Sequence, residues 1–336
     1  MINQTSQTLY RLDNLNAEQT RISYQMATGK KIDNGSDDAS LYSREILVDD
    51  RIRTYEGIKY QIERTTAQNN ASDSTIGEMK KLFELVKTEL IKANTATTSD
   101  EGRKAIALNV AGIKENLLDL ANTQIEGEYL FAGSDSSVIP FVEDASGQVT
   151  FNGDNGYRKI AVDDGSYRLR GVNGYDVMTY PSSTANKNET LSFTADDVII
   201  DQDGSIWALN GTNTEIQKLN NDGSVDTSVV GKTVVITADG YDVDVGSLDG
   251  TEFEARSSIF DLLDKITNTL NKKDSDGNPI SSDVASDLLG KTQEAFSNSY
   301  DALNQAMLQH HDYLLDNKCQ IEENNILRVF KNIFMT

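Results

Sequence analysis

The spacing of apolar residues in one segment of the first half most strongly constrains how this chain can fold. Ile106, Val110, Ile113, Leu117 and Leu120 follow one another in alternating steps of four and three, which places all five on one side of an α-helix. A helix with such a stripe gains most of its stability by burying the stripe against another element. We therefore expect these five residues to form the core of a helical bundle.

A narrower apolar seam runs along the first 26 residues of the chain, which are otherwise polar. Its apolar residues also recur with helical spacing. A seam with steps near seven is typical of a helix that packs against a partner helix, so it is a candidate assembly surface. Its members are Ile2, Leu9, Leu12, Leu15, Ile22 and Met26.

Turn-forming residues separate this helix from a second one, predicted from about Ala39 to Asn94. Gly29 follows the seam, where a left-handed residue commonly ends a helix. Asp37 and Asp38 offer carboxylates that cap the next helix. The second helix has a polar gap between residues 64 and 75, which weakens its apolar seam. Thr98 and Glu101 have the spacing of a capping box and predict the start of the third helix.

From residue 133 to residue 255 the pattern changes to one typical of β-structure. Nine Asp-Gly or Asn-Gly pairs occur between residues 152 and 250, and such pairs supply the positive φ values of tight hairpins. Short runs such as 158–162, 167–172 and 233–237 read as strands, and Trp207 is interpreted as a packed strand residue. The segment has 21 acidic and 7 basic residues, which favours an outward-facing, solvated domain.

Helical spacing returns at Ile259 and again from about Ser282 to Met307. The predicted fold class is therefore α+β, with an elongated bundle of long coiled-coil-like helices from both chain ends and a β-rich domain inserted between them. The expected divisions are an N-terminal assembly helix and loop, the two parts of the bundle, the β-rich domain and an atypical tail. Their ranges are 1–38 for the assembly helix and loop, 39–132 and 256–312 for the bundle, 133–255 for the β-rich domain and 313–336 for the tail.

Composition argues against several classes of function. A net charge of −22 repels phosphate backbones, so no nucleic-acid partner is expected, and anionic membrane surfaces are disfavoured for the same reason. The N-terminal residues have no basic segment followed by an apolar one, and no apolar run reaches the length of a transmembrane helix. The single Cys319 rules out an internal disulfide framework.

No constellation typical of catalysis, cofactor binding or metal binding is expected. Setting Gly223 at the sixth position of a calcium loop puts Lys218 at the first, where a ligand is required. His310 and His311 are adjacent, so they cannot form the i, i+4 pair of a metal-binding helix, and both are expected to be exposed. No phosphate loop, serine elbow or Cys/His cluster is present, which argues against an enzyme.

Two motifs resemble the flagellin superfamily, and within it the hook-associated protein 3 branch. The run of Ala121, Asn122 and Thr123, then Gly127, then Tyr129, Leu130, Phe131 and Gly133 is similar to the family motif that closes the N-terminal helical region. Residues 27–39, Ala-Thr-Gly-Lys-Lys-Ile-Asp-Asn-Gly-Ser-Asp-Asp-Ala, resemble the family loop between the first two helices, although the family has Pro where this chain has Ala39. The resemblance implies that Gly29, Asp37 and Asp38 of this loop contact neighbouring subunits. The segment 150–162 resembles the start of the family's β domain.

The resemblance implies a structural subunit at the junction of hook and filament, with no enzymatic activity and no cofactor. The expected partners are identical subunits in a ring, the other hook-associated protein on the hook side and flagellin on the filament side. The implied location is extracellular, on the flagellum, after passage through the flagellar export apparatus without a cleaved signal peptide. An export chaperone of the family would be expected to bind the tail.

Residues 313–336 depart from the helical ending that the family normally has, so a truncated, frame-altered or divergent tail is a hypothesis here. The alternatives are a flagellin of the filament itself and, from another class, a secreted adhesin that uses residues 133–255 to bind a ligand. The ending of the motif in Tyr129-Leu130-Phe131-Ala132-Gly133 favours the junction branch over flagellin.

Overall fold

The computed structural model describes most of the 336-residue chain. The described residues are 2–29, 36, 38–95, 97–154, 156–163, 165–202, 204–220, 223–237, 240–247, 252–275 and 277–334. Side chains are described for all of these except 2, 3, 162, 163, 170, 247 and 311–334. By its internal contacts the chain divides into two units, Met1–Gln61 with Asp163–Gly165, and Ile62–Val162 with Ser166–Thr336.

The first unit holds one complete helix and the start of another. Helix α1 spans Ile2–Thr28, and the first residues of helix α2 (Ala39–Ala93) belong to the same unit. Gly29 ends α1 with a φ of 69° and donates its N–H to the carbonyl of Gln25 at 2.8 Å, which is the left-handed helix end expected there.

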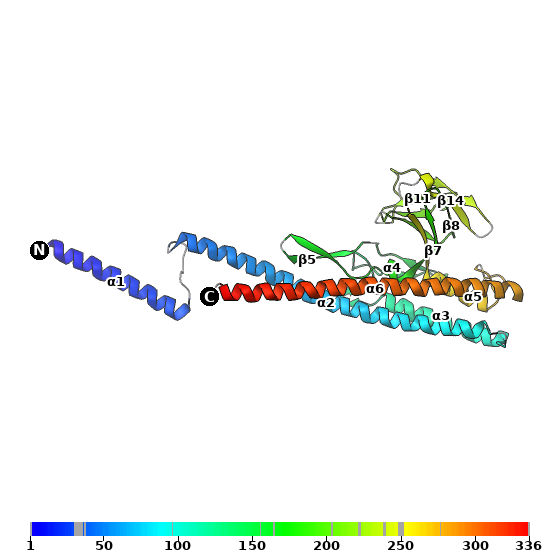
Figure 1. Cartoon of the computed structure of the whole chain (residues 1–336), viewed down its shortest axis with the longest axis horizontal. Coiled ribbons are helices and arrows are strands. Elements are labelled where there is room, and N and C mark those ends of the chain that lie inside the picture. The colour runs from blue at the N-terminus through cyan, green and yellow to red at the C-terminus, as the bar shows by residue number, and fades with distance from the viewer. Residues whose placement is uncertain are drawn as a thin grey trace. The chain divides into compact units, whose positions relative to one another are not determined.

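The second unit combines helices from both halves of the sequence with a β-rich region between them (Figure 1). Its helices are the remainder of α2, α3 (Asp100–Ala121), α4 (Gly174–Met178), α5 (Ile259–Leu270), α6 (Ser282–Phe334) and the short 3₁₀ helix η1 (Val245–Ser247). The described elements therefore confirm the predicted α+β class, with helices of both chain ends flanking inserted strands.

Among the described residues, the strands form two larger antiparallel sheets and three hairpins. A six-stranded sheet has the order β12-β11-β10-β9-β15-β7, and a three-stranded sheet has the order β13-β14-β8. The other pairs are β1-β2, β3-β4 and β5-β6. The bounds are β1 Gln124–Ile125, β2 Glu128–Tyr129, β3 Phe141–Glu143, β4 Val149–Phe151, β5 Arg158–Asp163, β6 Ser166–Arg170, β7 Thr179–Asn186, β8 Thr190–Phe193, β9 Val198–Asp201, β10 Ile206–Leu209, β11 Glu215–Leu219, β12 Lys232–Thr233, β13 Val235–Ile236, β14 Tyr241–Asp244 and β15 Glu252–Ser258.

The chain enters the six-stranded sheet through β7 and leaves it through β15, and these two strands are direct neighbours. Their register runs from Glu252 opposite Asn186 to Ser258 opposite Thr179, with one irregularity between Ala255 and Arg256. Ser258 then caps α5 by accepting the N–H of Phe260 on its hydroxyl. The sheet is therefore joined to the bundle by two adjacent strands.

Two separate apolar cores stabilise the second unit. The bundle core brings together α2, α3, α5 and α6 with part of the β-rich region, and the second core lies within the larger sheets. In the bundle core the rings of Phe83 on α2 and Phe296 on α6 lie 5.4 Å apart between centroids. Trp207 belongs to the second core, where it is buried on β10, as its sequence context predicted.

The start of α3 corrects one sequence expectation. The residue that caps α3 is Ser99, whose hydroxyl accepts the N–H of Gly102 at 3.1 Å. Thr98 instead donates its hydroxyl to the carbonyl of Lys92 at 2.6 Å, closing the loop after α2. The capping box expected from Thr98 and Glu101 is therefore wrong, because Thr98 is held by the preceding helix.

A buried lysine ties three elements of the bundle together. The ammonium of Lys114 on α3 donates to Asp264 of α5 at 2.6 Å and to the carbonyl of Gly147, in the β3–β4 loop, at 2.7 Å. One turn before Asp264, burial raises the pKa of Asp261 to about 6, and the nearby charge of Asp196 adds to the effect. Acidic groups at this end of α5 are therefore held in a poorly solvated environment.

Truncating one ring of the aromatic pair tests how much the contact between α2 and α6 contributes to the free energy of unfolding. We expect Phe83→Ala to lower the free energy of unfolding by about 3–5 kcal/mol, because it leaves a cavity beside Phe296. Leu85→Ala is the matched control on the same helix, since that side chain is 53% exposed, and its loss is expected to stay below about 1 kcal/mol. Equal losses in denaturant titrations of the two variants would contradict this account of the core.

The buried carboxyl of Asp261 generates a prediction on pH. Because its folded pKa is raised to about 6, its proton favours the folded state below the unfolded pKa, near 4, and this contribution is lost as pH rises through 6. We expect Asp261→Asn to raise the neutral-pH free energy of unfolding by on the order of 1–3 kcal/mol, partly offset by loss of a charge near a helix N-terminus.

Unfolding measured between pH 4 and pH 7.5 checks this. The advantage of the variant over the unmodified protein should shrink toward pH 4. Asp287→Asn, at an exposed carboxylate on α6, should leave the pH profile unchanged.

Candidate assembly surface and motif core

The sequence motif folds into a tight hairpin immediately after α3. Strands β1 and β2 pair around Glu126 and Gly127, whose φ values are 54° and 81°. Two positive φ values at the centre of a two-residue turn are typical of a type I′ hairpin. Leu130 then donates its N–H to the carbonyl of Thr123 at 3.1 Å. The motif therefore doubles back across the end of the helix that precedes it.

Charged side chains fasten this hairpin to the polar gap of α2. Arg64 donates to Glu126 and to Glu128, each at 2.9 Å, and Gln68 donates to Glu128 at 2.9 Å. Arg158 of β5 donates to the same Glu128 carboxylate at 3.2 Å. Glu128 thus accepts hydrogen bonds from two separate elements, α2 and β5, which gives the polar gap a specific partner.

The polar gap of α2 is buried, which the weakness of its apolar seam does not predict. Thr65, Gln68, Asn69, Ser72 and Thr75 are each at most 8% exposed. Buried polar groups are tolerated where they form hydrogen bonds. The network around Glu128 and the bond that the Thr75 hydroxyl donates to the carbonyl of Ala71 meet part of this requirement.

His310 on α6 corrects a second expectation. Its side chain is 1% exposed rather than exposed, and its Nε2 lies 3.2 Å from the backbone carbonyl of Asn69 on α2. A carbonyl can only accept, so this contact requires the proton on Nε2. The side chain of His311 lies outside the described residues.

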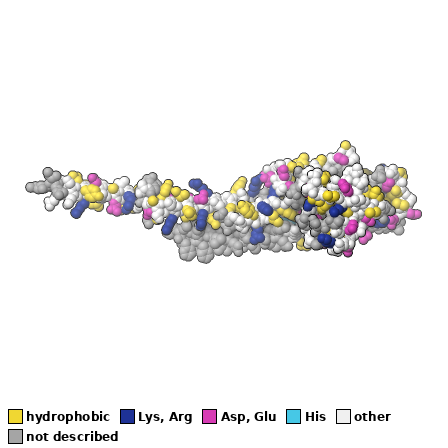
Figure 2. Space-filling model, turned by 90° about the horizontal axis from the view of Figure 1, so that it is seen from above, with side chains coloured by type: hydrophobic (Ala, Val, Ile, Leu, Met, Phe, Trp, Pro, Cys, Tyr) yellow, Lys and Arg dark blue, Asp and Glu magenta, His cyan; other side chains and the backbone are white. Residues whose placement is uncertain are grey.

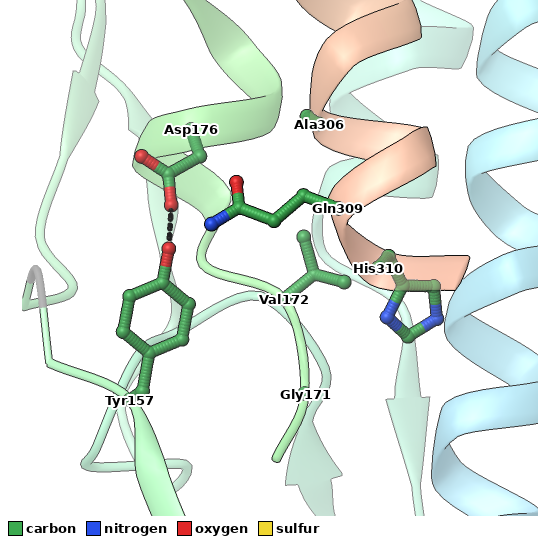
Figure 3. A pocket seen from close by; sticks show the side chains of 7 residues that line it. All are labelled: Tyr157, Gly171, Val172, Asp176, Ala306, Gln309 and His310. Carbon is green, nitrogen blue, oxygen red and sulfur yellow. Dashed lines mark hydrogen bonds between the residues drawn. The ribbon is translucent and has the colours of Figure 1, made fainter. Parts of the chain in front are cut away.

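His310 also lines a small pocket between α6, α4 and the residues that flank the β5–β6 hairpin (Figure 3). Tyr157 donates its hydroxyl to Asp176 of α4, and the amide of Gln309 extends toward that pair (Figure 3). The volume is about 10 Å³, close to the space that one water molecule needs. The pocket is therefore a packing gap, too small for an organic substrate.

The end of the motif is held by Asn122 and Gly133. Asn122 donates its amide to the carbonyl of Phe141 at 2.9 Å and accepts the N–H of the same residue at 3.1 Å. The amide side chain therefore satisfies both backbone groups of Phe141, as a neighbouring strand would. Gly133 has a φ of 88°, and a Cβ placed on it would lie 2.1 Å from the carbonyl oxygen of Asp154. Only glycine fits at this crossing of two backbone segments.

Asp154 fastens the other side of that crossing. Its carboxylate accepts the N–H and hydroxyl of Ser134 at 2.9 and 2.5 Å, the N–H of Gly156 at 2.7 Å and the N–H of Asp135 at 3.2 Å. Burial acts to raise the pKa of this carboxyl, but these hydrogen bonds outweigh it and hold the pKa below its ordinary value. The similarity of segment 150–162 to the family thus falls on residues that contact the motif.

The predicted bundle-core and motif residues occupy a continuous part of the second unit. Ile106, Val110, Ile113 and Leu117 are buried, and Leu120 is half-buried against the same core. In the motif, Ala121, Leu130, Phe131 and Gly133 are buried, Asn122, Thr123 and Tyr129 are half-buried, and Gly127 is exposed. The sequence did not single out Lys114, Arg64 or Asp154, because their partners lie far away in the chain.

The predicted seam of α1 is exposed along its described length. The exposed fractions are 59% for Leu9, 55% for Leu12, 66% for Leu15, 47% for Ile22 and 83% for Met26. Figure 2 shows hydrophobic side chains on the surface of this N-terminal helix, between charged and other side chains. The side chain of Ile2 lies outside the described residues. A seam of this kind is a candidate surface for helix packing.

Of the two aspartates expected to cap α2, the structure describes only one. Asp38 caps α2, since one of its carboxylate oxygens accepts the N–H groups of Ser40 and Leu41, each at 3.0 Å. Asp37 lies outside the described residues. Contacts of Gly29, Asp37 and Asp38 with other subunits stay a prediction.

Other kinds of site receive no support from the described residues. Within the described part of the chain, no helix is both long and apolar enough to cross a membrane. No group of three or more His, Cys, Asp or Glu in those same residues is arranged to hold a metal ion.

A pair of glycine substitutions separates steric conflict from backbone strain in the motif. Gly127 and Gly133 both have positive φ, at 81° and 88°, but a Cβ on Gly127 meets nothing within 4 Å. We expect Gly127→Ala to lower the free energy of unfolding by about 1–2 kcal/mol through backbone strain alone. Gly133→Ala should cost clearly more, because the Asp154 backbone must also move. Similar losses in denaturant unfolding would show that the crossing is not tightly packed.

Comparison with known proteins shows which proteins this chain is similar to. Residues 2–136 match the family model described as the bacterial flagellin N-terminal helical region. The chain is 26% identical over 214 residues to flagellar hook-associated protein 3 of Salmonella typhimurium, covering 62% of this chain and 66% of that protein. It is 29% identical over 136 residues to the Escherichia coli protein of the same name, covering 40% and 42%. The alignments thus span less than two thirds of each relative's own length.

Solved structures show the same fold. A hook-associated protein 3 of Legionella pneumophila matches with a TM-score of 0.58 and 19% identity, covering 86% of this chain and 97% of that one. The FlgL protein of Xanthomonas campestris matches with a TM-score of 0.56 and 14% identity, covering 88% and 100%. The N-terminal region of this chain is thus similar to the bacterial flagellin N-terminal helical region, and the chain shares the fold of these solved hook-associated proteins.

Proposed function

We propose that this chain is a structural subunit of the bacterial flagellum that joins hook and filament through helix packing between subunits. The observation that carries the proposal is the exposed apolar seam of α1, in a chain similar to proteins named flagellar hook-associated protein 3. A coarser role as a flagellar structural protein is supported by these similarities alone. The junction role adds a specific use for the seam.

Burial of the seam against neighbouring subunits supplies the energy of assembly in this proposal. Each large apolar side chain gains about 1.5–3 kcal/mol when it passes from water into a packed interface. Five described seam residues are at least 47% exposed, so a helix from another subunit can remove a large apolar area from water. Repetition of the same contact around a closed ring makes the joint strong although each contact is modest.

The proposal gives each region of the chain a separate structural role. Residues 1–38 provide the assembly helix and loop, and residues 39–132 with 256–312 provide the bundle that forms the wall of the structure. Residues 133–255, with 21 acidic and 7 basic residues, face outward, where their charge is solvated. The partners are copies of the same chain, the other hook-associated protein on the hook side and flagellin on the filament side. The location is extracellular, on the flagellum.

Electron microscopy of intact cells with gold-labelled antibodies against residues 133–255 tests the location. Label in a single cluster at each boundary between hook and filament supports the proposal. Label along the whole filament would instead identify a flagellin. Label on the cell surface away from flagella would favour an adhesin.

Substitutions in the seam test the mechanism. We expect the triple variant Leu9→Ser, Leu12→Ser, Leu15→Ser to reduce labelled junctions at least about tenfold, since several kcal/mol per contact are removed. Its unfolding transition should stay unchanged, because all three side chains are at least 55% exposed.

The matched control is Val230→Ser, Val235→Ser, Ile236→Ser. These residues are 65–81% exposed on the β-rich region, and labelled junctions should form normally. A seam variant that assembles as well as this control would exclude the seam as the joint.

A further inference from the structure

Positive charge in the β-rich region is concentrated on one hairpin. Residues 158–170, which contain β5 and β6, include Arg158, Lys159, Arg168 and Arg170, four of the seven basic residues between 133 and 255. They include only two acidic residues, at positions 163 and 164. The rest of the chain holds 27 basic and 51 acidic residues. The hairpin is therefore a local reversal of the charge that dominates the chain.

The two faces of β5 have different surroundings. Arg158 and Ile160 are largely buried, and Arg158 forms the ion pair with Glu128 at 3.2 Å. Lys159, which lies between them and points to the opposite face, is exposed. One cation of this strand thus anchors the hairpin to the motif, and the next is directed to solvent.

Strand β6 is exposed on both faces over its described side chains. Tyr167 is 64% exposed and Leu169 is 38% exposed, and Arg168 between them is exposed as well. Strands β5 and β6 form a two-stranded sheet of their own (Figure 1). Neither Lys159 nor Arg168 forms an ion pair with another described residue. The hairpin therefore presents two exposed cations that have no ion pair among the described side chains.

We infer that the β5–β6 hairpin is an electrostatic docking surface for an acidic face of a second copy of this chain. This inference rests on the proposed ring of identical subunits. Copies that each carry a net charge of −22 repel one another once their surfaces approach within a Debye length, about 8–10 Å at physiological salt. A contact between them is favoured where one copy offers cations and the other acidic side chains. Lys159 and Arg168 supply the cations.

The choice of a second copy follows from charge complementarity. The chain outside residues 158–170 has an excess of 24 acidic over basic residues, so acidic surface is abundant on any identical neighbour. In a ring, each hairpin meets the next subunit in the same way, and every copy uses both halves of the contact. The hairpin contact thereby adds a second, charged interaction to the apolar seam.

Zero-length cross-linking of isolated flagella tests the contact directly. A carbodiimide joins a lysine amine to a carboxylate only when the two groups touch. Flagella from cells that make the full chain are treated with the reagent, and the covalent dimer of the chain is separated from the monomer and analysed by peptide mass spectrometry. We expect Lys159 linked to an Asp or Glu of the same sequence in the dimer and not in the monomer.

Charge removal gives the second readout. In the double variant Lys159→Gln, Arg168→Gln, the dimer linked through the hairpin should disappear. The variant should also be released from isolated flagella at a lower NaCl concentration than the unmodified chain. Loss of two surface ion pairs of about 0.2–1 kcal/mol each weakens every contact about 2- to 30-fold. The matched control, Lys187→Gln, Lys273→Gln, removes two exposed lysines elsewhere and should match the unmodified chain in both measurements.

The outcomes separate this inference from the proposed function. A chain that is present at junctions but never cross-linked through Lys159 would overturn the hairpin contact and leave the junction role intact. Cross-links from Lys159 to a different flagellar protein would overturn the second copy as the occupant. Absence of the chain from flagella would overturn both proposals.

Discussion

Packing between helices from opposite ends of the sequence is the constraint on which the rest of the second unit depends. Phe83 and Phe296 meet in the bundle core although more than two hundred residues separate them. The core includes side chains from α2, α3, α5 and α6, so none of these helices buries its stripe alone. Contacts so distant in sequence carry a large loop-closure cost that only a substantial apolar core offsets. The motif hairpin, the crossing at Gly133 and the buried charge of Lys114 are all placed relative to this core.

The features that sequence reasoning predicted are those encoded by local spacing. The alternating steps of α3 gave its apolar stripe, and the long helix from Ala39 was predicted to within one residue at its C-terminal end. The strands around 158–162 and 233–237 correspond to β5 and to β12 with β13. In each case the information lies within a few neighbouring residues, because helix and strand periods are short.

The features that were missed depend on partners far away in the chain. The polar gap of α2 looked like a weak seam, yet its residues are buried because Glu128 and the backbone of the bundle receive their hydrogen bonds. His310 was expected to be exposed because nothing near it in sequence signals the carbonyl of Asn69, 3.2 Å away. The cap of α3 moved by one residue because the end of α2 holds Thr98. Periodicity identifies which face of a helix is apolar, but it does not identify which polar residues have partners.

The adjacency of β7 and β15 has a consequence for how such a chain can vary. Thr179 and Ser258 are opposite each other in the ladder, so the chain leaves the bundle and returns to it at almost the same point. An inserted module with neighbouring ends can change in length, sequence or surface without altering the distance that the bundle must span. The bundle and the six-stranded sheet have separate apolar cores. The inserted module is therefore an exchangeable part, and natural selection on its surface can proceed without disturbing the helices of the bundle.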